Sequence, residues 1–336
     1  SNKVDGLLES INTCRVTGVP TNIAHLTPGW RLTPEGNDYL EEHNIRATLK
    51  YFDEAIAEGM VLTFDSMPWF LRAGFDVMPY LSSILNPWLK ECGSREKFAE
   101  WLKVADYREE IIDALKNGKW YIRLAYNPNT NPQWAENIWI SGHKDSSLVG
   151  KNLAMIAAER DSDKIHTWFD LICEDPDAMG YAAGTADTGN FPWKPYRALM
   201  FQHKAGSLSL DQAVFDADYK MERPPYRRPG RNAFGAFPGF INQMVKDSKI
   251  FTLEEAIYKI STAAAEYHNL EGLGTITPGS YADITVFDYD KLEVVGTPVE
   301  PSQHPNGIEY VFVNGVVVVE KGTHTGATPG RIVKRV

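Results

Sequence analysis

The sequence predicts an α/β protein that begins with a parallel sheet, contains an inserted subdomain and ends in short β-strands. Three observations predict this fold class. Helix-type and strand-type segments alternate up to residue 66, prolines and tryptophans interrupt the alternation from 67 to about 140, and short β runs follow Glu271. We therefore expect four regions, at 3–66, 67–190, 191–270 and 271–336.

The first region contains two helix–strand units. Apolar residues recur at helical spacing over 4–15, and an extended segment follows at 21–26. A second amphipathic helix is expected over 46–58, where Gly59 stops it, and a second strand over 60–64. Helices that alternate with buried strands are typical of a parallel sheet.

Parallel strands joined by right-handed crossovers bring their carboxyl ends to one rim of the sheet. We expect strands near 21–26, 60–65 and 206–210 to lie parallel in this way. His25 and Asp211 would then meet at the same rim, which is where α/β proteins carry their functional groups.

The middle of the chain is rich in tryptophan. These residues include Trp69, Trp88, Trp101, Trp120, Trp134 and Trp139. An amphipathic run over 94–115 and helices expected over 148–160, 164–173 and 194–202 accompany them. The tryptophans predict a small core that belongs to the insert or, from composition alone, an aromatic surface that binds carbohydrate.

Two local signals define the structure near the end of the chain. Thr252 and Glu255 form a capping box, in which each side chain accepts from the other residue's backbone N–H, so a helix begins here. Strands are expected over 283–288 and 310–319. Asn314-Gly315 splits the second of these into a hairpin with a type I′ turn.

Composition limits the class of partner. The chain has 34 Lys and Arg against 44 Asp and Glu, a formal net charge of −10, which argues against nucleic acids and anionic membranes as partners. No segment approaches the ~18 consecutive apolar residues of a membrane span. The 3 cysteines lie far apart, which predicts neither a zinc knot nor a disulfide framework and indicates a reducing, cytoplasmic compartment. A small molecule is the expected ligand.

Several motifs resemble a known family. They are Gly274-x-Ile276-x-Pro278-Gly279-x-x-Ala282-Asp283-Ile284-x-Val286-Phe287-Asp288, Val313-Asn314-Gly315, His324-Thr325-Gly326-Ala327-x-Pro329-Gly330-Arg331 and Phe234-Gly235-x-Phe237-Pro238. The first is shared by many members of the amidohydrolase superfamily, and the last two resemble its N-acyl-D-amino-acid deacylase (D-aminoacylase) branch. Upstream, the segment 19–26 is similar to the family's barrel strand that ends in a metal-binding histidine. His203 followed by Asp211 resembles the passage into the last barrel strand and its aspartate.

The resemblance implies the C-terminal part of a (β/α)8 barrel. In this interpretation 3–66 holds barrel βα units, 67–190 a lid-like insert and its following helices, 191–270 the last barrel strand with its helices, and 271–336 part of a small β-sandwich. The family's His-x-His pair does not occur, so we expect this chain to be part of a longer protein. Alone, it is expected to expose sheet edges and a large apolar face, and to form a homo-oligomer or bind the missing N-terminal segment.

The resemblance also implies functional residues. His25 and Asp211 correspond to zinc ligands, Asp211 also to the catalytic base, and Arg231 to the group that binds the substrate carboxylate. Their structural alternatives are a core or loop histidine, a helix-capping aspartate and a solvated loop arginine. Asp187, which is flanked by glycines, competes for the role of the aspartate, but the spacing from His203 favours Asp211.

The implied function is metal-dependent hydrolysis of C–N amide bonds, with N-acyl amino acids as substrates. The alternative is a non-catalytic fragment or assembly module that keeps the scaffold without the metal site. Because a catalytic zinc usually takes three protein ligands, we expect an incomplete zinc site in this chain. Thr27 and Met67-Pro68-Trp69 stand where the family has a lysine and Tyr-Pro-Tyr, so specificity for D-amino acids stays open.

Overall fold

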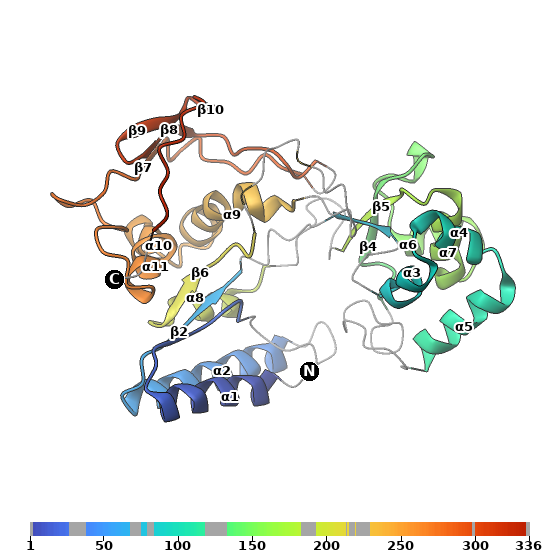
Figure 1. Ribbon diagram of the computed structural model, residues 1–336, viewed down its shortest axis with the longest axis horizontal. Helices are drawn as coiled ribbons and strands as arrows, with labels where there is room; N and C mark the ends of the chain where they lie inside the picture. The colour runs from blue at the N-terminus through green and yellow to red at the C-terminus, as the bar shows by residue number, and fades with distance from the viewer. Residues whose placement is uncertain are drawn as a thin grey trace.

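The computed structural model describes residues 3–26, 38–67, 75–78, 84–117, 133–182, 193–212, 214, 219, 229–297 and 300–333. The parallel sheet and its helices are α1 (Lys3–Thr17), β1 (Thr21–Ile23), α2 (Asp38–Ala57), β2 (Leu62–Ser66), α8 (Leu199–Gln202) and β6 (Gly206–Leu208). The insert holds β3 (Phe75–Val77), α3 (Asn86–Cys92), α4 (Arg95–Trp101), α5 (Ala105–Lys116), β4 (Ile138–Gly142), α6 (Leu153–Glu159), α7 (Lys164–Glu174) and β5 (Met179–Ala182). The remainder forms α9 (Arg231–Ile241), α10 (Leu253–Ile260), α11 (Thr262–Tyr267), β7 (Ile284–Phe287), β8 (Ile308–Val313), β9 (Val316–Glu320) and β10 (Thr323–His324), as Figure 1 shows. None of the described helices is long and apolar enough to cross a bilayer.

The three strands predicted to lie parallel do so, in the order β1-β2-β6. Thr21 lies opposite Leu62, and Phe64 lies opposite Gly206. Each strand is shorter than expected, but the predicted arrangement is confirmed. The packing is close at β6, because a Cβ on Gly206 would lie 2.2 Å from the backbone oxygen of Met200, so only glycine fits.

The two faces of this sheet differ in polarity. Leu62 and Phe64 are buried on the face that α1 and α2 cover, where the rings of Phe64 and Phe52 are 4.7 Å apart between centroids. The opposite face carries polar side chains in matching register: Asn22, Thr63, Asp65 and Ser207. The expectation of a large apolar face is therefore wrong for the described strands, because these four side chains are polar. Asn22 hydrogen-bonds to Asp65 and to Thr63, and Ser207 donates to the carbonyl of Phe64 at 3.5 Å.

The insert has a hydrophobic core of its own. It is built from residues between Met78 and Ala178 and includes the buried Trp168 and Phe169. The other clusters of described buried residues contain none from this range. Of the predicted tryptophans, those with at most 6% exposure are Trp88, Trp134 and Trp139. Trp101 is 49% exposed, and Trp69 and Trp120 lie outside the described residues. The described tryptophans thus fit the satellite-core interpretation.

The local signals near the end of the chain are confirmed. The Thr252 hydroxyl accepts from the backbone N–H of Glu255 at 3.2 Å, and the Glu255 carboxylate accepts from the N–H of Thr252 at 2.8 Å. The helix that begins there is divided at Ser261 into α10 and α11, since Ser261 has a non-helical backbone. Asn314 and Gly315 have φ of 50° and 78°, as a type I′ turn requires.

Three of the motifs behind the family resemblance lie in or beside a four-stranded antiparallel sheet, β10-β9-β8-β7, whereas Phe234-Gly235-x-Phe237-Pro238 lies on α9. Asp283 accepts from the backbone N–H of Asn314 at 2.7 Å, and the Asn314 amide donates to the carbonyl of Pro329 at 2.7 Å. Arg331 donates to Asn314, and its guanidinium lies 3.4 Å from the ring centroid of Tyr281. These residues fasten the end of the chain to the hairpin turn.

Candidate functional site

The carboxyl ends of β1 and β6 bring His25 and Asp211 together, as expected. Nε2 of His25 lies 3.5 Å from Oδ1 of Asp211, and each side chain is 52% exposed. Both residues have a left-handed backbone, with φ of 39° at His25 and 50° at Asp211. Such backbones are uncommon outside glycine and cluster at functional sites. His25 is thus not a core histidine, and Asp211 does not cap a helix at Gln212, which is not helical.

A side-chain network on β1 and β2 holds the backbone of His25. Asp65 accepts from the backbone N–H of His25 at 2.8 Å and from the side-chain amide of Asn22 at 2.9 Å. Thr63 donates its hydroxyl to the side-chain oxygen of Asn22 at 2.9 Å. The backbone N–H of Leu26 donates to the carbonyl of Asp65 at 2.8 Å. The turn at His25 is therefore tied to β2 by both side chain and backbone.

The backbone before Asp211 is held in a comparable way. Asn232, the second residue of α9, donates its side-chain amide to the carbonyl of Leu210 at 2.8 Å. Asn232 is 5% exposed, so water competes little for this hydrogen bond. The N–H of Ser209 donates to the carbonyl of Ser66 at 3.0 Å and extends the pairing of β6 with β2.

The donor types and their separation at this rim fit a zinc ion. Two ligand atoms bound at about 2.1 Å to a tetrahedral zinc lie about 3.4 Å apart. The 3.5 Å between the His25 nitrogen and the Asp211 oxygen matches that spacing and is long for a hydrogen bond. In the part of the chain that the structure describes, no group of three or more His, Cys, Asp or Glu side chains could hold a metal. The described residues thus bring two side chains of ligand type together at the rim, one fewer than a catalytic zinc usually has.

Arg231 begins α9 and is only 7% exposed. The alternative of a solvated loop arginine is therefore wrong. Its neighbour Asn232 binds Leu210, so the beginning of α9 lies beside the end of β6. The N-terminus of α9 adds partial positive charge beside the end of β6.

Groups with a shifted pKa lie at the opposite, amino end of β6. Lys259 on α10 donates to the carbonyls of His203 at 2.8 Å and Gly206 at 2.9 Å. Burial lowers the pKa of Lys259 to about 8. Burial also lowers the pKa of His203, whose Nε2 lies 3.2 Å from Asp53. Lys259 therefore stabilises the start of β6, at the end of the strand away from the rim.

Sequence reasoning found the two residues that meet at the rim but missed those that hold them. Asn22, Asp65 and Asn232 were not among the predicted site residues. One signal for Asp65 exists. It is a carboxylate near the end of β2, where partly exposed residues alternate with buried ones. The competing candidate Asp187 lies outside the described residues.

Comparison with known sequences places the chain near one family. Residues 230–318 match the family model described as Amidohydrolase family. D-aminoacylase from Alcaligenes xylosoxydans xylosoxydans is 32% identical over 112 residues, which are 33% of this chain and 23% of that protein. N-acyl-D-glutamate deacylase from the same organism is 29% identical over 136 residues, 40% of this chain and 26% of that protein.

Solved structures extend the likeness over the fold. A crystal structure of D-aminoacylase aligns with a TM-score of 0.60 at 21% identity and covers 99% of this chain and 53% of that chain. N-acyl-D-glutamate deacylase from Bordetella bronchiseptica, complexed with zinc and a phosphonate inhibitor, aligns with a TM-score of 0.54 at 20% identity, covering 93% of this chain and 49% of that chain. The chain thus spans about half the length of these structures, and its matches cover about a quarter of the curated relatives.

These comparisons confirm the resemblance. The chain is similar to the amidohydrolases, and its mixed α/β fold is similar to part of the D-aminoacylase fold. Within that superfamily, its relatives include the deacylases of N-acyl-D-amino acids, which are hydrolytic enzymes. One of the related structures contains zinc.

Proposed function

We propose that this chain is the C-terminal part of a metal-dependent amidohydrolase that removes the acyl group from N-acyl amino acids. The parallel sheet β1-β2-β6 is then part of a (β/α)8 barrel, 67–190 is its insert, and β7–β10 belong to a small β-sandwich. The observation that carries the proposal is the 3.5 Å approach of His25 to Asp211 at the carboxyl rim, with both residues in a left-handed backbone.

In this function His25 and Asp211 would hold a zinc ion together with ligands from outside the described residues. When bound, zinc would lower the pKa of water to near neutrality and polarise an acyl carbonyl. The carboxylate of Asp211 accepts a proton from water and returns it to the leaving amine. Arg231 binds the substrate carboxylate in bidentate geometry, and the N-terminus of α9 favours the same negative charge.

A second candidate is a non-catalytic assembly module. It is favoured by the metal-ligand count, because the described residues bring two ligands to the rim. It is also compatible with the sheet order, in which β1 and β6 are the outer strands of the described sheet. Under both candidates these edges pair with a missing segment or with a second copy of the chain. The carbohydrate-binding alternative has less support, because the insert tryptophans Trp88, Trp134 and Trp139 are buried.

The test measures hydrolysis of N-acetyl-D- and N-acetyl-L-amino acids in the presence of zinc, detected as release of the free amine. It is performed on this chain and on a longer version that contains the upstream sequence. In the active form, His25→Ala and Asp211→Asn should each lower kcat by at least about 100-fold, a loss typical for ligands and bases. His268→Ala is the matched control, because His268 is an exposed histidine at the end of α11. Activity that survives both rim substitutions would favour the assembly module.

A further inference from the structure

We propose that Asp65 is the residue that positions His25. Its carboxylate holds the backbone of His25 in the left-handed conformation from which the imidazole reaches Asp211. This inference deepens the proposed function, because the purpose of the contact between His25 and Asp211 rests on it. The hydrogen bonds themselves do not depend on it.

The geometry supports positioning because one carboxylate closes the turn after β1. Oδ1 of Asp65 accepts the backbone N–H of His25, and Oδ2 accepts the side-chain amide of Asn22. Asn22 lies on β1, three residues before His25, so the carboxylate spans the last residues of the strand and the start of the turn. A hydrogen bond to a charged acceptor is stronger than one between neutral groups, which offsets the unfavourable φ of 39°.

Asp65 differs in this respect from Asp211, although both are carboxylates near the same rim. Each oxygen of Asp65 accepts from the β1 segment, whereas Asp211 presents an oxygen to the imidazole of His25. Asp65 therefore acts through His25 and not as a ligand.

Two substitutions separate these roles. Asp65→Ala removes the acceptor for the N–H of His25. Asp65→Asn removes the charge but keeps an amide oxygen that can accept the same N–H, since Asn22 can turn its own amide over and donate to the hydroxyl of Thr63. A positioning residue tolerates the second change, whereas a metal ligand or a base does not.

The experiment measures hydrogen exchange at the backbone amide of His25 by NMR on the full chain, together with the nuclear Overhauser contact between its imidazole and the side chain of Asp211. We expect Asp65→Ala to raise the exchange rate at His25 by about tenfold and to abolish the contact. Asp65→Asn should stay within about threefold of the unaltered protein, and Thr63→Val, which removes only the outer hydrogen bond, should do the same.

Swapping the residue types at positions 22 and 65 tests for rescue. Asn22→Asp alone places two carboxylates face to face and should raise exchange at His25 as Asp65→Ala does. The double variant N22D/D65N restores a donor opposite each acceptor and should return the rate to within about threefold of the original.

Three outcomes would overturn the proposal: an unchanged rate in Asp65→Ala, equal losses in Asp65→Asn and Asp65→Ala, or faster exchange spread evenly along β1 and β2. None of these readouts uses catalytic activity. A longer version that contains the upstream sequence and hydrolyses no amide would therefore refute the proposed function and leave this positioning result standing.

Discussion

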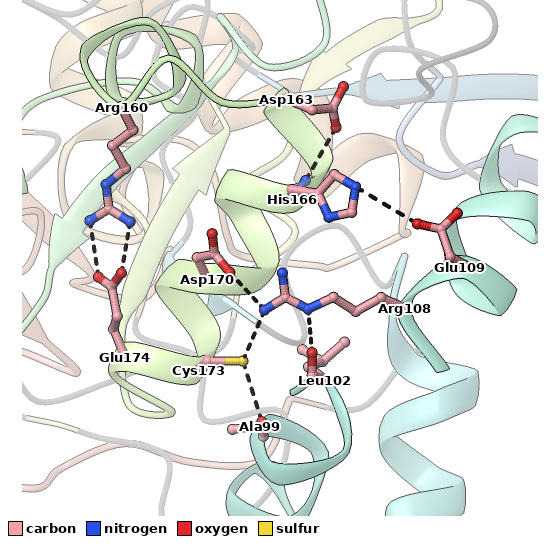
Figure 2. A network of polar contacts seen from close by, with 10 residues as sticks. All are labelled: Ala99, Leu102, Arg108, Glu109, Arg160, Asp163, His166, Asp170, Cys173 and Glu174. Carbon is pink, nitrogen blue, oxygen red and sulfur yellow. Dashed lines mark hydrogen bonds and ion pairs between the residues drawn. The ribbon is translucent and has the colours of Figure 1, made fainter. Parts of the chain in front are cut away.

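The polar contacts of the insert and those of the sheet rim are built differently. In the insert, Arg160 makes a bidentate pair with Glu174 at 2.7 and 3.0 Å. Arg108 lies 2.7 Å from Asp170 and also donates to the carbonyl of Leu102, as Figure 2 shows. At the rim, by contrast, His25 and Asp211 share one contact of 3.5 Å and are half exposed.

The difference separates stabilising interactions from functional ones. The insert pairs join α4, α5, α6 and α7 around an apolar core and leave their charges matched. The rim pair shares a single contact between half-exposed side chains, which contributes little stability. We infer that the ion pairs of the insert contribute more to stability than the rim contact does.

The insert and the sheet should unfold as separate units, and the largest expected effect tests this. Trp168 is 1% exposed in the core of the insert, and Phe52 is fully buried beneath the sheet. Each substitution to Ala should destabilise its own region by about 3–5 kcal/mol. Hydrogen exchange should therefore rise in α7 with Trp168→Ala and in β2 with Phe52→Ala. If either variant raised the rate of hydrogen exchange equally in both regions, the two regions would form a single cooperative core.

The second prediction concerns the amino end of β6, which lies opposite the rim. Burial lowers the pKa of Lys259 to about 8 in the folded state, from its ordinary value of 10.5. Between these values the unfolded chain binds the proton and the folded chain does not, so stability contributed by this site rises with pH over that window. Each pKa unit corresponds to about 1.4 kcal/mol, which makes about 3.5 kcal/mol an upper bound. The carbonyls of His203 and Gly206 favour the charged form and reduce it.

Lys259→Met removes this titration. The unfolding free energy of the original protein minus that of the variant should therefore increase from pH 8 to pH 10.5. Urea denaturation at fixed ionic strength measures both values. A difference that stays constant over the window would mean that the two carbonyls hold the ammonium at its ordinary pKa.

The fold was predictable where the pattern is local. The apolar spacing of α1 and α7 and the capping box at Thr252 depend on neighbours along the chain, and the helices lie where these signals predict them. The antiparallel sheet of the insert was not predicted. Its strands are three to five residues long, and β3 pairs with β5 about a hundred positions away, as in Phe75 opposite Tyr181. Short strands with remote partners leave no local signature.

The site was predictable only in part, for a related reason. The rule for parallel strands and the family resemblance both place His25 and Asp211 at one rim. The roles of Asp65 and Asn232 depend on which backbone N–H or carbonyl faces each side chain, and this follows from the left-handed turns at His25 and Asp211. A sequence pattern indicates that conformation at Asn314, where Gly315 follows it between two strands, but neither His25 nor Asp211 has such a pattern beside it.

The last and smallest effect is the most direct test of the difference between the two regions. His25→Asn and Asp211→Asn replace residues that are half exposed, and asparagine tolerates the left-handed backbone well. Each substitution should therefore change the free energy of unfolding by less than about 0.5 kcal/mol. The matched variant in the insert, Glu174→Gln, weakens a bidentate pair with Arg160 and should lower it by about 1 kcal/mol. Urea denaturation of the three variants under one buffer gives the comparison. If Asp211→Asn destabilises the protein more than Glu174→Gln does, the rim contact is a structural interaction, and its left-handed backbone would need another explanation than function.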